Sequence, residues 1–133
     1  MLAVVGDEED AAIGSHRWFA HLTARLQLPC EVIGKEDFRW EEPYILGVGS
    51  EQEYLRLCRI QPSFQDVYSL EGIEPTVDAS AWAMRSDDIG ARVRRVDDGK
   101  EFVLGLSELT TLDVDSANAP LLDDYSMWFW NSR

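Results

Sequence analysis

The stretch IGARVRRVDDGKEFVLGL, residues 89–106, decides the fold because it has the pattern of a β-hairpin. Two strand-forming runs flank Asp97, Asp98 and Gly99. An Asp-Gly pair between such runs is the strongest short-range hairpin signal, since glycine accepts a positive φ angle without steric cost. We therefore expect two antiparallel strands joined by a tight turn at Gly99.

Other short runs before this hairpin extend the predicted sheet. CEVIG at residues 30–34 and PYILGVG at 43–49 are of the β type, and a short strand is expected at 67–70. EYLRLCRI at 53–60 fits a strand or a helix equally well. Several short strands at close spacing predict a small, strongly bent antiparallel sheet or a partial barrel.

An amphipathic helix is expected near the N-terminus, over residues 11–27. Trp18, Leu22 and Leu26 recur at the three- to four-residue spacing of one helical face, and Pro29 ends the segment. This helix would pack on the sheet, which makes the expected fold class α+β.

The C-terminal stretch LLDDYSMWFWNSR ends the chain with an aromatic segment. Asn118 and Pro120 are typical of a helix start. Apolar residues then follow at helical spacing, namely Leu121, Leu122, Tyr125, Trp128 and Phe129. A strand is the alternative, since Tyr125, Met127 and Phe129 also alternate. In either form we expect this segment to dock on the core, because its exposure would be unfavourable.

The length of 133 residues and the 45% share of apolar residues fit a single α+β domain, residues 1–133. Residues 1–10 have the character of a loose acidic lead. They lack the basic region and the long apolar region of a signal peptide, and no run of about 18 apolar residues occurs. A cytoplasmic location is the resulting expectation.

The charge is the most informative part of the composition. Asp and Glu number 25 against 12 Lys and Arg, which gives a formal net charge of -13. Nucleic-acid phosphates and anionic lipid surfaces would be repelled by this charge. A metal cation or a basic protein partner would be attracted.

Three groups of acidic residues are candidate calcium ligands, because calcium takes six to eight oxygen ligands from carboxylates, amides, carbonyls and water. The groups are Glu36, Asp37, Glu41 and Glu42; Asp113 and Asp115; and Asp123 and Asp124. DVDSAN at 113–118 begins like an EF-hand loop but lacks its glycine and its final glutamate.

Motifs of catalysis are not found in the sequence. His16 and His21 are five residues apart, which does not place them on one helical face, and Cys30 and Cys58 have no metal-type spacing. No HExxH, CxxC, phosphate-loop or dinucleotide-binding pattern occurs. We therefore expect a protein that is not an enzyme.

A family resemblance is carried by RWFAHL leading into LQLPCEV, and by the last 32 residues, FVLGLSELTTLDVDSANAPLLDDYSMWFWNSR. These stretches resemble the CcbP-type small acidic calcium-binding proteins of cyanobacteria and other bacteria. The middle of the chain, about residues 47–88, shows no such match. The resemblance implies a compact α+β protein that binds calcium through surface acids and buffers or senses it in the cytoplasm. It also implies that the ligands come from the acidic loop after the first strand and from the acids near the C-terminus. In that loop Asp37 is the first choice, with Glu41 or Glu42 able to reach the same ion.

Two functions of different classes follow. The leading hypothesis is a bacterial calcium-binding protein that uses Ca²⁺ ions at its acidic loops. The alternative is an acidic protein-interaction module, such as an inhibitor or an immunity-type protein, which would bind a basic partner with surface residues including Trp40 and Trp82.

Overall fold

The structure, a computed structural model, describes residues 11–47, 49–77 and 82–131, with side chains from Gly14 onward. The predicted loose lead at residues 1–10 lies outside this part of the chain. The helices are α1 (Ala11–Arg25), α2 (Glu42–Ile45), α3 (Glu51–Leu57), the 3₁₀ helix η1 (Leu106–Glu108) and α4 (Asn118–Asn131). The strands are β1 (Cys30–Gly34), β2 (Tyr68–Glu74), β3 (Gly90–Arg95), β4 (Glu101–Gly105) and β5 (Leu109–Thr111).

The five strands form one sheet in the order β4-β3-β2-β1-β5, and every neighbouring pair is antiparallel. β4 and β5 are the two edges, so the sheet is open and does not close into a barrel. A register shift between Leu70 and Gly72 in β2 adds a local bend. The predicted α+β fold class is confirmed.

The hairpin of residues 89–106 is present as expected. β3 and β4 pair with Val93 opposite Phe102, and Gly99 has a φ angle of 77°. The Arg95 N–H donates to the Lys100 carbonyl at 2.7 Å, and the Gly99 N–H donates to the Arg95 carbonyl at 2.8 Å. The turn is therefore closed by main-chain hydrogen bonds around a residue whose φ favours glycine.

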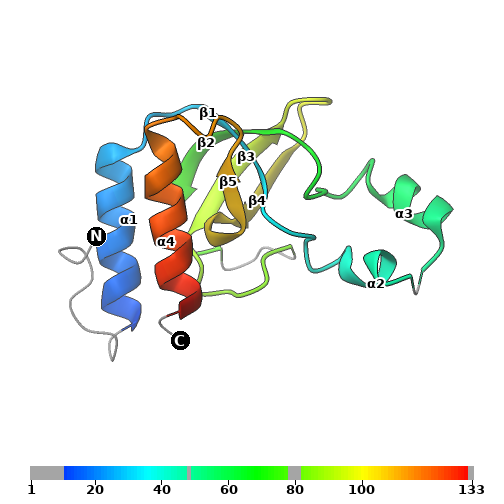
Figure 1. The fold of residues 1–133 in the computed structure, drawn as a ribbon, viewed down its shortest axis with the longest axis horizontal. Coiled ribbons are helices and arrows are strands. Elements are labelled where there is room, and N and C mark those ends of the chain that lie inside the picture. The colour runs from blue at the N-terminus through cyan, green and yellow to red at the C-terminus, as the bar shows by residue number, and fades with distance from the viewer. Residues whose placement is uncertain (1–10, 48, 78–81, 132–133) are drawn as a thin grey trace.

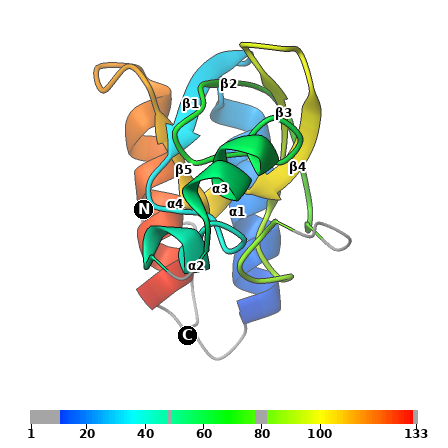
Figure 2. The ribbon, with the colours of Figure 1, turned by 90° about the vertical axis from the view of Figure 1, so that its right-hand side faces the viewer.

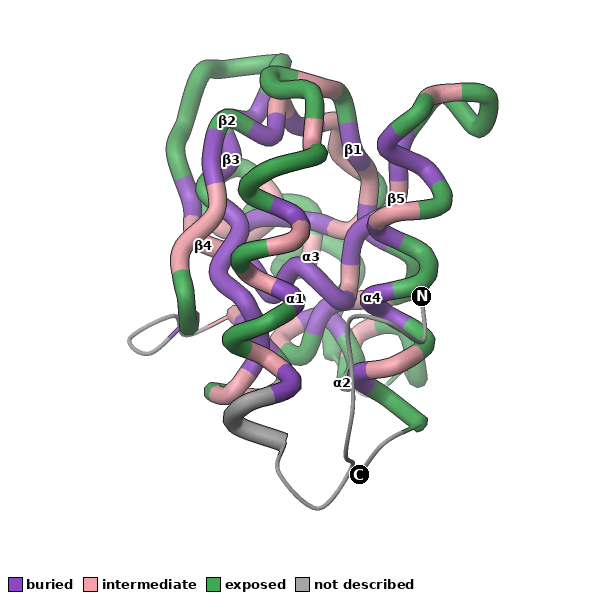
Figure 3. Tube along the Cα trace, turned by 90° about the vertical axis from the view of Figure 1, so that its left-hand side faces the viewer, coloured by how far each residue is buried: buried purple, intermediate pink, exposed green. Residues whose placement is uncertain are grey.

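Two helices lie side by side against one face of the sheet, α1 and α4 (Figure 1). Their inner residues are almost completely buried, namely Trp18, Leu22, Leu122, Tyr125 and Phe129. Figure 3 shows buried and exposed stretches alternating along these helices, as amphipathic packing requires. Burial of each large side chain contributes roughly 1.5–3 kcal/mol. The aromatic C-terminal segment is thus a docked helix, and the strand alternative for it is wrong.

Residues 35–67, between β1 and β2, leave the sheet and form what we call the excursion, which contains α2 and α3. It lies on the side of the sheet away from α1 and α4 (Figures 1 and 2). Neither α2 nor α3 contains a buried residue. Within the described part of the chain, no helix has the length and apolar character needed to cross a membrane.

The strand predicted at residues 43–49 is wrong, because this segment forms α2 and a turn. Pro43 lies in the first turn of α2, where its missing N–H is not needed, and Gly47 ends the helix region with a φ angle of 83°. The ambiguous run at 53–60 is mainly helical, and its N-cap Ser50 accepts a hydrogen bond from the Glu53 N–H at 3.2 Å. β2 begins at Tyr68 and extends beyond the strand predicted at 67–70.

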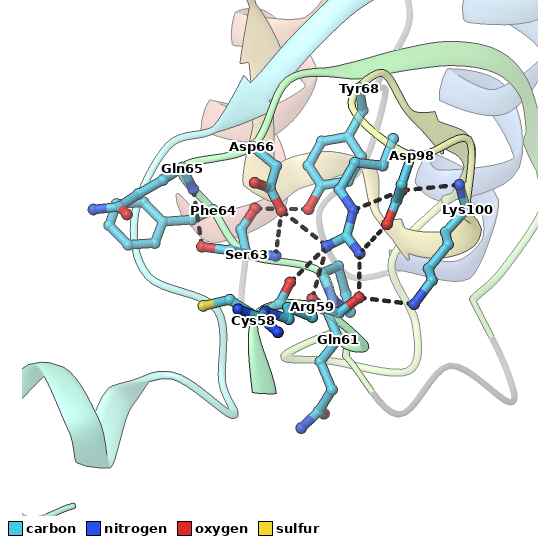
Figure 4. A network of polar contacts seen from close by, with 12 residues as sticks. Cys58, Arg59, Gln61, Ser63, Phe64, Gln65, Asp66, Tyr68, Asp98 and Lys100 are labelled. Atoms are coloured by element: carbon cyan, nitrogen blue, oxygen red, sulfur yellow. Dashed lines mark hydrogen bonds and ion pairs between the residues drawn. The ribbon is translucent and has the colours of Figure 1, made fainter. Parts of the chain in front are cut away.

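A buried arginine joins the excursion to the hairpin. The Arg95 side chain is 3% exposed. Its guanidinium donates at 2.8–3.0 Å to the carbonyls of Cys58, Arg59 and Gln61 and to the carboxylates of Asp66 and Asp98. Figure 4 shows these acceptors gathered around one point. Hydrogen bonds from Arg95 lower the pKa of Asp98 to about 2.

We predict that Arg95→Met lowers the free energy of unfolding by about 3–5 kcal/mol, because two carboxylates and three carbonyls lose their shared donor. Urea unfolding measures this loss. Relative to the unchanged protein, amide hydrogen exchange should accelerate more in α3 than in β4, because the anchor of the excursion is removed.

The matched control is Arg94→Met on the same strand. Arg94 pairs with Glu71 and Glu101 at the surface, with its side chain 45% exposed, so its loss should cost less than about 1 kcal/mol. Equal losses for the two variants would show that Arg95 is not the anchor described above.

Candidate functional site

A cleft of about 520 Å³ lies where the loop after β1 meets η1 and the end of α4. We call it the acidic cleft, and it is lined by Lys35, Glu36, Asp37, Met84, Ser107, Glu108, Ser126 and Trp130. The Lys35 N–H donates to the Glu108 carbonyl at 2.9 Å. That hydrogen bond holds the end of β1 against η1, which brings residues about seventy positions apart to one site.

Asp88, which is fully buried just before β3, is bonded to Ser107, one of the residues that line the acidic cleft. Its carboxylate accepts from the Tyr125 hydroxyl at 2.8 Å and from the Ser107 hydroxyl at 2.6 Å. The Tyr125 oxygen in turn accepts from the Ile89 N–H at 3.0 Å. The Ser126 hydroxyl donates to the Ser107 carbonyl at 2.7 Å. These contacts fix α4 and η1 against the start of β3.

Glu108 lies close to Asp88 and reaches the cleft. An ideal Cβ placed on Gly105 would lie 2.5 Å from Asp88 Oδ2 and 2.6 Å from Glu108 Oε2, so these oxygens are no more than about 5.1 Å apart. Both carboxyl groups thus approach a backbone position that only glycine leaves open. Of the two, Asp88 is fully enclosed and Glu108 lines the cleft.

The two neighbouring carboxyl groups have raised pKa values. Burial, with a smaller contribution from the Asp88 carboxylate, raises the pKa of Glu108 to about 7, although the hydrogen bond from the Met84 N–H opposes this rise. Burial raises the pKa of Asp88 to about 6, against the hydrogen bonds from Ser107 and Tyr125. A negative charge on Glu108 is therefore poorly compensated by the protein, and a bound cation would stabilise it.

The first predicted acidic group is divided by the structure. Glu36 and Asp37 line the acidic cleft. Glu42 is exposed and begins α2.

Glu41 is fully buried, so the expectation that it lies in a surface loop is wrong. Its carboxylate accepts four hydrogen bonds at 2.6–3.1 Å, from the N–H groups of Phe38 and Phe64 and the hydroxyls of Tyr54 and Ser63. Four internal donors give this carboxylate a structural role in holding the excursion.

The acids predicted at the start of the C-terminal helix are not among the residues that line the acidic cleft. Asp123 is in the second turn of α4, where it accepts from Thr110 at 3.1 Å and pairs with Lys35 at 3.5 Å. Asp124 follows it and is exposed.

Asp113 and Asp115 lie in the turn after β5. The Asp115 N–H donates to the Asp113 carboxylate at 2.9 Å. Asp113 also lines a smaller cleft of about 360 Å³ together with Glu31. The structure therefore places this second predicted acidic group outside the acidic cleft.

The described residues contain no group of three His, Cys, Asp or Glu side chains that could hold a metal ion as they stand. Sequence reasoning named Glu36 and Asp37, which line the cleft, but it did not name Glu108 or Asp88. Neither residue carries a sequence signal, because an acid in a chain with 25 acids is not distinctive. Their importance arises from burial, which depends on the tertiary fold.

Comparisons with protein-family models, with curated proteins and with solved structures found no match for this chain. The resemblance to CcbP-type proteins therefore stays a prediction from the quoted residues. The function has to be argued from the geometry and electrostatics of the cleft.

We predict that the protein becomes less stable as the pH rises from about 4 to about 8. The pKa values of Asp88 and Glu108 are higher in the folded chain than their ordinary values of 3.8 and 4.5, so the folded state binds more protons in this range. Stability from these groups is complete below pH 4 and is lost as the pH passes about 6 and then about 7. For Glu108 the change is about 3 kcal/mol.

Urea unfolding at pH 5 and pH 8 measures this dependence. Glu108→Gln, which keeps an oxygen to accept from Met84, should have a clearly smaller loss of stability between the two pH values. Glu101→Gln, an exposed acid whose side chain is 70% exposed, controls for the general negative charge. The same pH dependence in Glu108→Gln and Glu101→Gln would contradict the role given to burial.

Proposed function

We propose that this is a calcium-binding protein and that the acidic cleft is its ion site. The observation that carries the proposal is the convergence of Glu36 and Asp37 with Glu108 on one cleft. A chain with a net charge of -13 gains stability when a divalent cation is bound among such carboxylates. The resemblance of the C-terminal stretch to CcbP-type proteins supports the same ion.

The donor set fits calcium in its chemistry. Three carboxylates and the hydroxyls of Ser107 and Ser126 are all oxygen donors, which a hard cation prefers. No three described acids are yet grouped closely enough for a metal, so binding would draw the loop carrying Asp37 toward Glu108. Such an open site belongs to the weak end of calcium affinities, roughly 10⁻⁶–10⁻³ M.

A binding role explains the raised pKa values better than catalysis does. Asp88 is fully enclosed and its carboxylate is satisfied by Ser107 and Tyr125, so it cannot exchange a proton directly with a ligand. Glu108 alone of this pair lines the cleft. A single accessible carboxyl group next to Glu36 and Asp37 can bind a cation through its negative charge. We therefore propose that the protein is not an enzyme.

Titration calorimetry with calcium chloride at low ionic strength should give saturable heat with a defined stoichiometry. Asp37→Asn and Glu108→Gln should each weaken binding by about ten-fold or more, because each removes a charged oxygen donor. Asp115→Asn, outside the cleft, is the matched control and should bind as the unchanged protein does. A silent titration, or a loss only in Asp115→Asn, would overturn the proposal.

Calcium at millimolar concentration should also raise the melting temperature, because a ligand that binds only the folded state stabilises it by mass action. Sodium chloride at matched ionic strength should raise it less, since it only screens the negative charge. Equal shifts of the melting temperature with the two salts would show that charge screening, and not calcium binding, causes the stabilisation. Thermal unfolding followed by circular dichroism separates these outcomes.

A further inference from the structure

The acidic cleft has an apolar side that a metal ion does not use. Met84 and Trp130 line it, with exposed fractions of 39% and 42%. The guanidinium of Arg85 lies over the rings of Phe129 and Trp130, at 4.8 and 5.7 Å from their centroids. Arg85 is also paired with Asp87 at 2.8 Å. Because Met84 precedes Arg85 in the chain, these contacts hold it next to the end of α4.

Trp130 is the most exposed of the described tryptophans. Trp40 and Trp82, which the sequence predicts at a contact surface, are partly buried against the core. The indole N–H of Trp82 also donates to Gln61 at 3.3 Å. The prediction that these two residues act as surface tryptophans is therefore wrong. Apolar and aromatic side chains beside a few polar groups are typical of a pocket for a small organic molecule, and Trp130 provides such a side chain in the acidic cleft.

The two hydroxyl groups that line the cleft have already used their hydrogens. The Ser107 hydroxyl donates to the Asp88 carboxylate at 2.6 Å, and the Ser126 hydroxyl donates to the Ser107 carbonyl at 2.7 Å. Each oxygen keeps a lone pair and can accept a hydrogen bond, but it has no hydrogen left to donate. A ligand that offers hydrogen-bond donors therefore suits these hydroxyls, and a ligand that needs donors does not.

The charge in the cleft is negative and is not cancelled by neighbouring bases. Lys35 is the one basic residue of the lining, and its ammonium group lies 3.5 Å from Asp123, which is not part of that lining. In the described part of the chain, no basic side chain forms an ion pair with Glu36, Asp37 or Glu108. The ligand that complements this lining is therefore a cation.

The size of the cleft and the spacing of its acids favour a cation larger than a metal ion. Its volume of about 520 Å³ lies in the range of pockets for small organic ligands, roughly 300–1,000 Å³. The described acids are not grouped closely enough to hold one metal ion as they stand. A molecule with two separated ammonium groups can pair with acids at different places in the cleft. Each ammonium group has three donors and no acceptor, which matches the lining.

We propose that the acidic cleft also binds a linear aliphatic diamine or polyamine. One ammonium group pairs with Glu108, a second pairs with Asp37 or Glu36, and the methylene chain between them lies against Met84 and Trp130. This proposal rests on the acidic cleft being a ligand site, as proposed above, but it does not require calcium to be a ligand there. Calcium and the diamine share carboxylates, whereas the apolar side of the cleft serves the diamine alone.

The probe is 1,5-diaminopentane, titrated calorimetrically into the full chain at pH 8 after divalent metals have been removed on a chelating resin. At this pH the amines and the acids of the cleft are charged. We expect saturable one-to-one binding. 1-Aminopentane, which has the same chain but a single ammonium group, should bind roughly ten-fold more weakly or less, because one charged pair is lost.

Two variants test the two halves of the site, each with a matched control. Glu108→Gln should weaken binding of the diamine by roughly ten-fold, and Asp115→Asn, outside the cleft, should leave it unchanged. Met84→Ser should weaken it by about three-fold, because the methylene chain loses an apolar contact. Met127→Ser changes an exposed methionine outside the cleft and should bind the diamine as the unchanged protein does.

Three results would overturn the proposal. The first is a titration without saturable heat. The second is equal binding in Glu108→Gln and Asp115→Asn, or equal binding of the two amines, which would reduce the effect to the general negative charge. The third is equal binding in Met84→Ser and Met127→Ser, which would remove the apolar side from the site. Saturable calcium binding without diamine binding would leave the proposed function standing, and diamine binding without calcium binding would overturn only that function.

Discussion

The buried carboxylate of Asp88 determines where the candidate site forms, because it holds three separated parts of the chain together. A carboxylate without solvent must find hydrogen-bond donors, and here they come from Ser107 in η1 and Tyr125 in α4. That requirement places Glu108, the neighbour of Ser107, beside Asp88 in the same dehydrated surroundings. Burial at this position is the main cause of the raised pKa of Glu108. Glu36 and Asp37, from the loop after β1, complete the acidic lining of the cleft.

The position of the excursion also depends on buried charged groups that require hydrogen-bond partners, here Glu41 and Arg95. Its helices bury no side chain in the core, so hydrophobic packing alone does not fix them. Glu41 gathers four donors and Arg95 gathers five acceptor residues, and each is almost completely enclosed. Buried charges of this kind require specific partners, and they therefore specify one position for the segment. The cost is that aliphatic residues such as Leu46 remain outside.

Local patterns in the sequence predicted the parts of the fold that local physics controls. Gly99 marked the hairpin turn, and the spacing of apolar residues marked α1 and α4. The segment 43–49 was misassigned because a short apolar run fits a strand and a helix alike. Apolar spacing left residues 53–60 undecided between strand and helix, and the pattern Ser50-x-x-Glu53, a helix N-terminal signal that this spacing does not include, would have favoured the helix α3. The role of Glu108 could not be predicted, since it depends on burial beside Asp88. The two residues are far apart in the sequence and form no local pattern.

The acidic cleft and the excursion share one connecting segment, residues 35–41, and its anchoring determines how far the effect of a ligand in the cleft extends. The Lys35 N–H is bonded to Glu108, while Phe38 is 1% exposed in the core and Glu41 is fully buried. Glu36 and Asp37 therefore lie on a short loop that is fixed on both sides. A cation in the cleft could draw these two residues inward, but Phe38 and Glu41 would have to leave the interior before α2 moved. Because that displacement is costly, ligand binding in the cleft should leave the excursion in place to a first approximation.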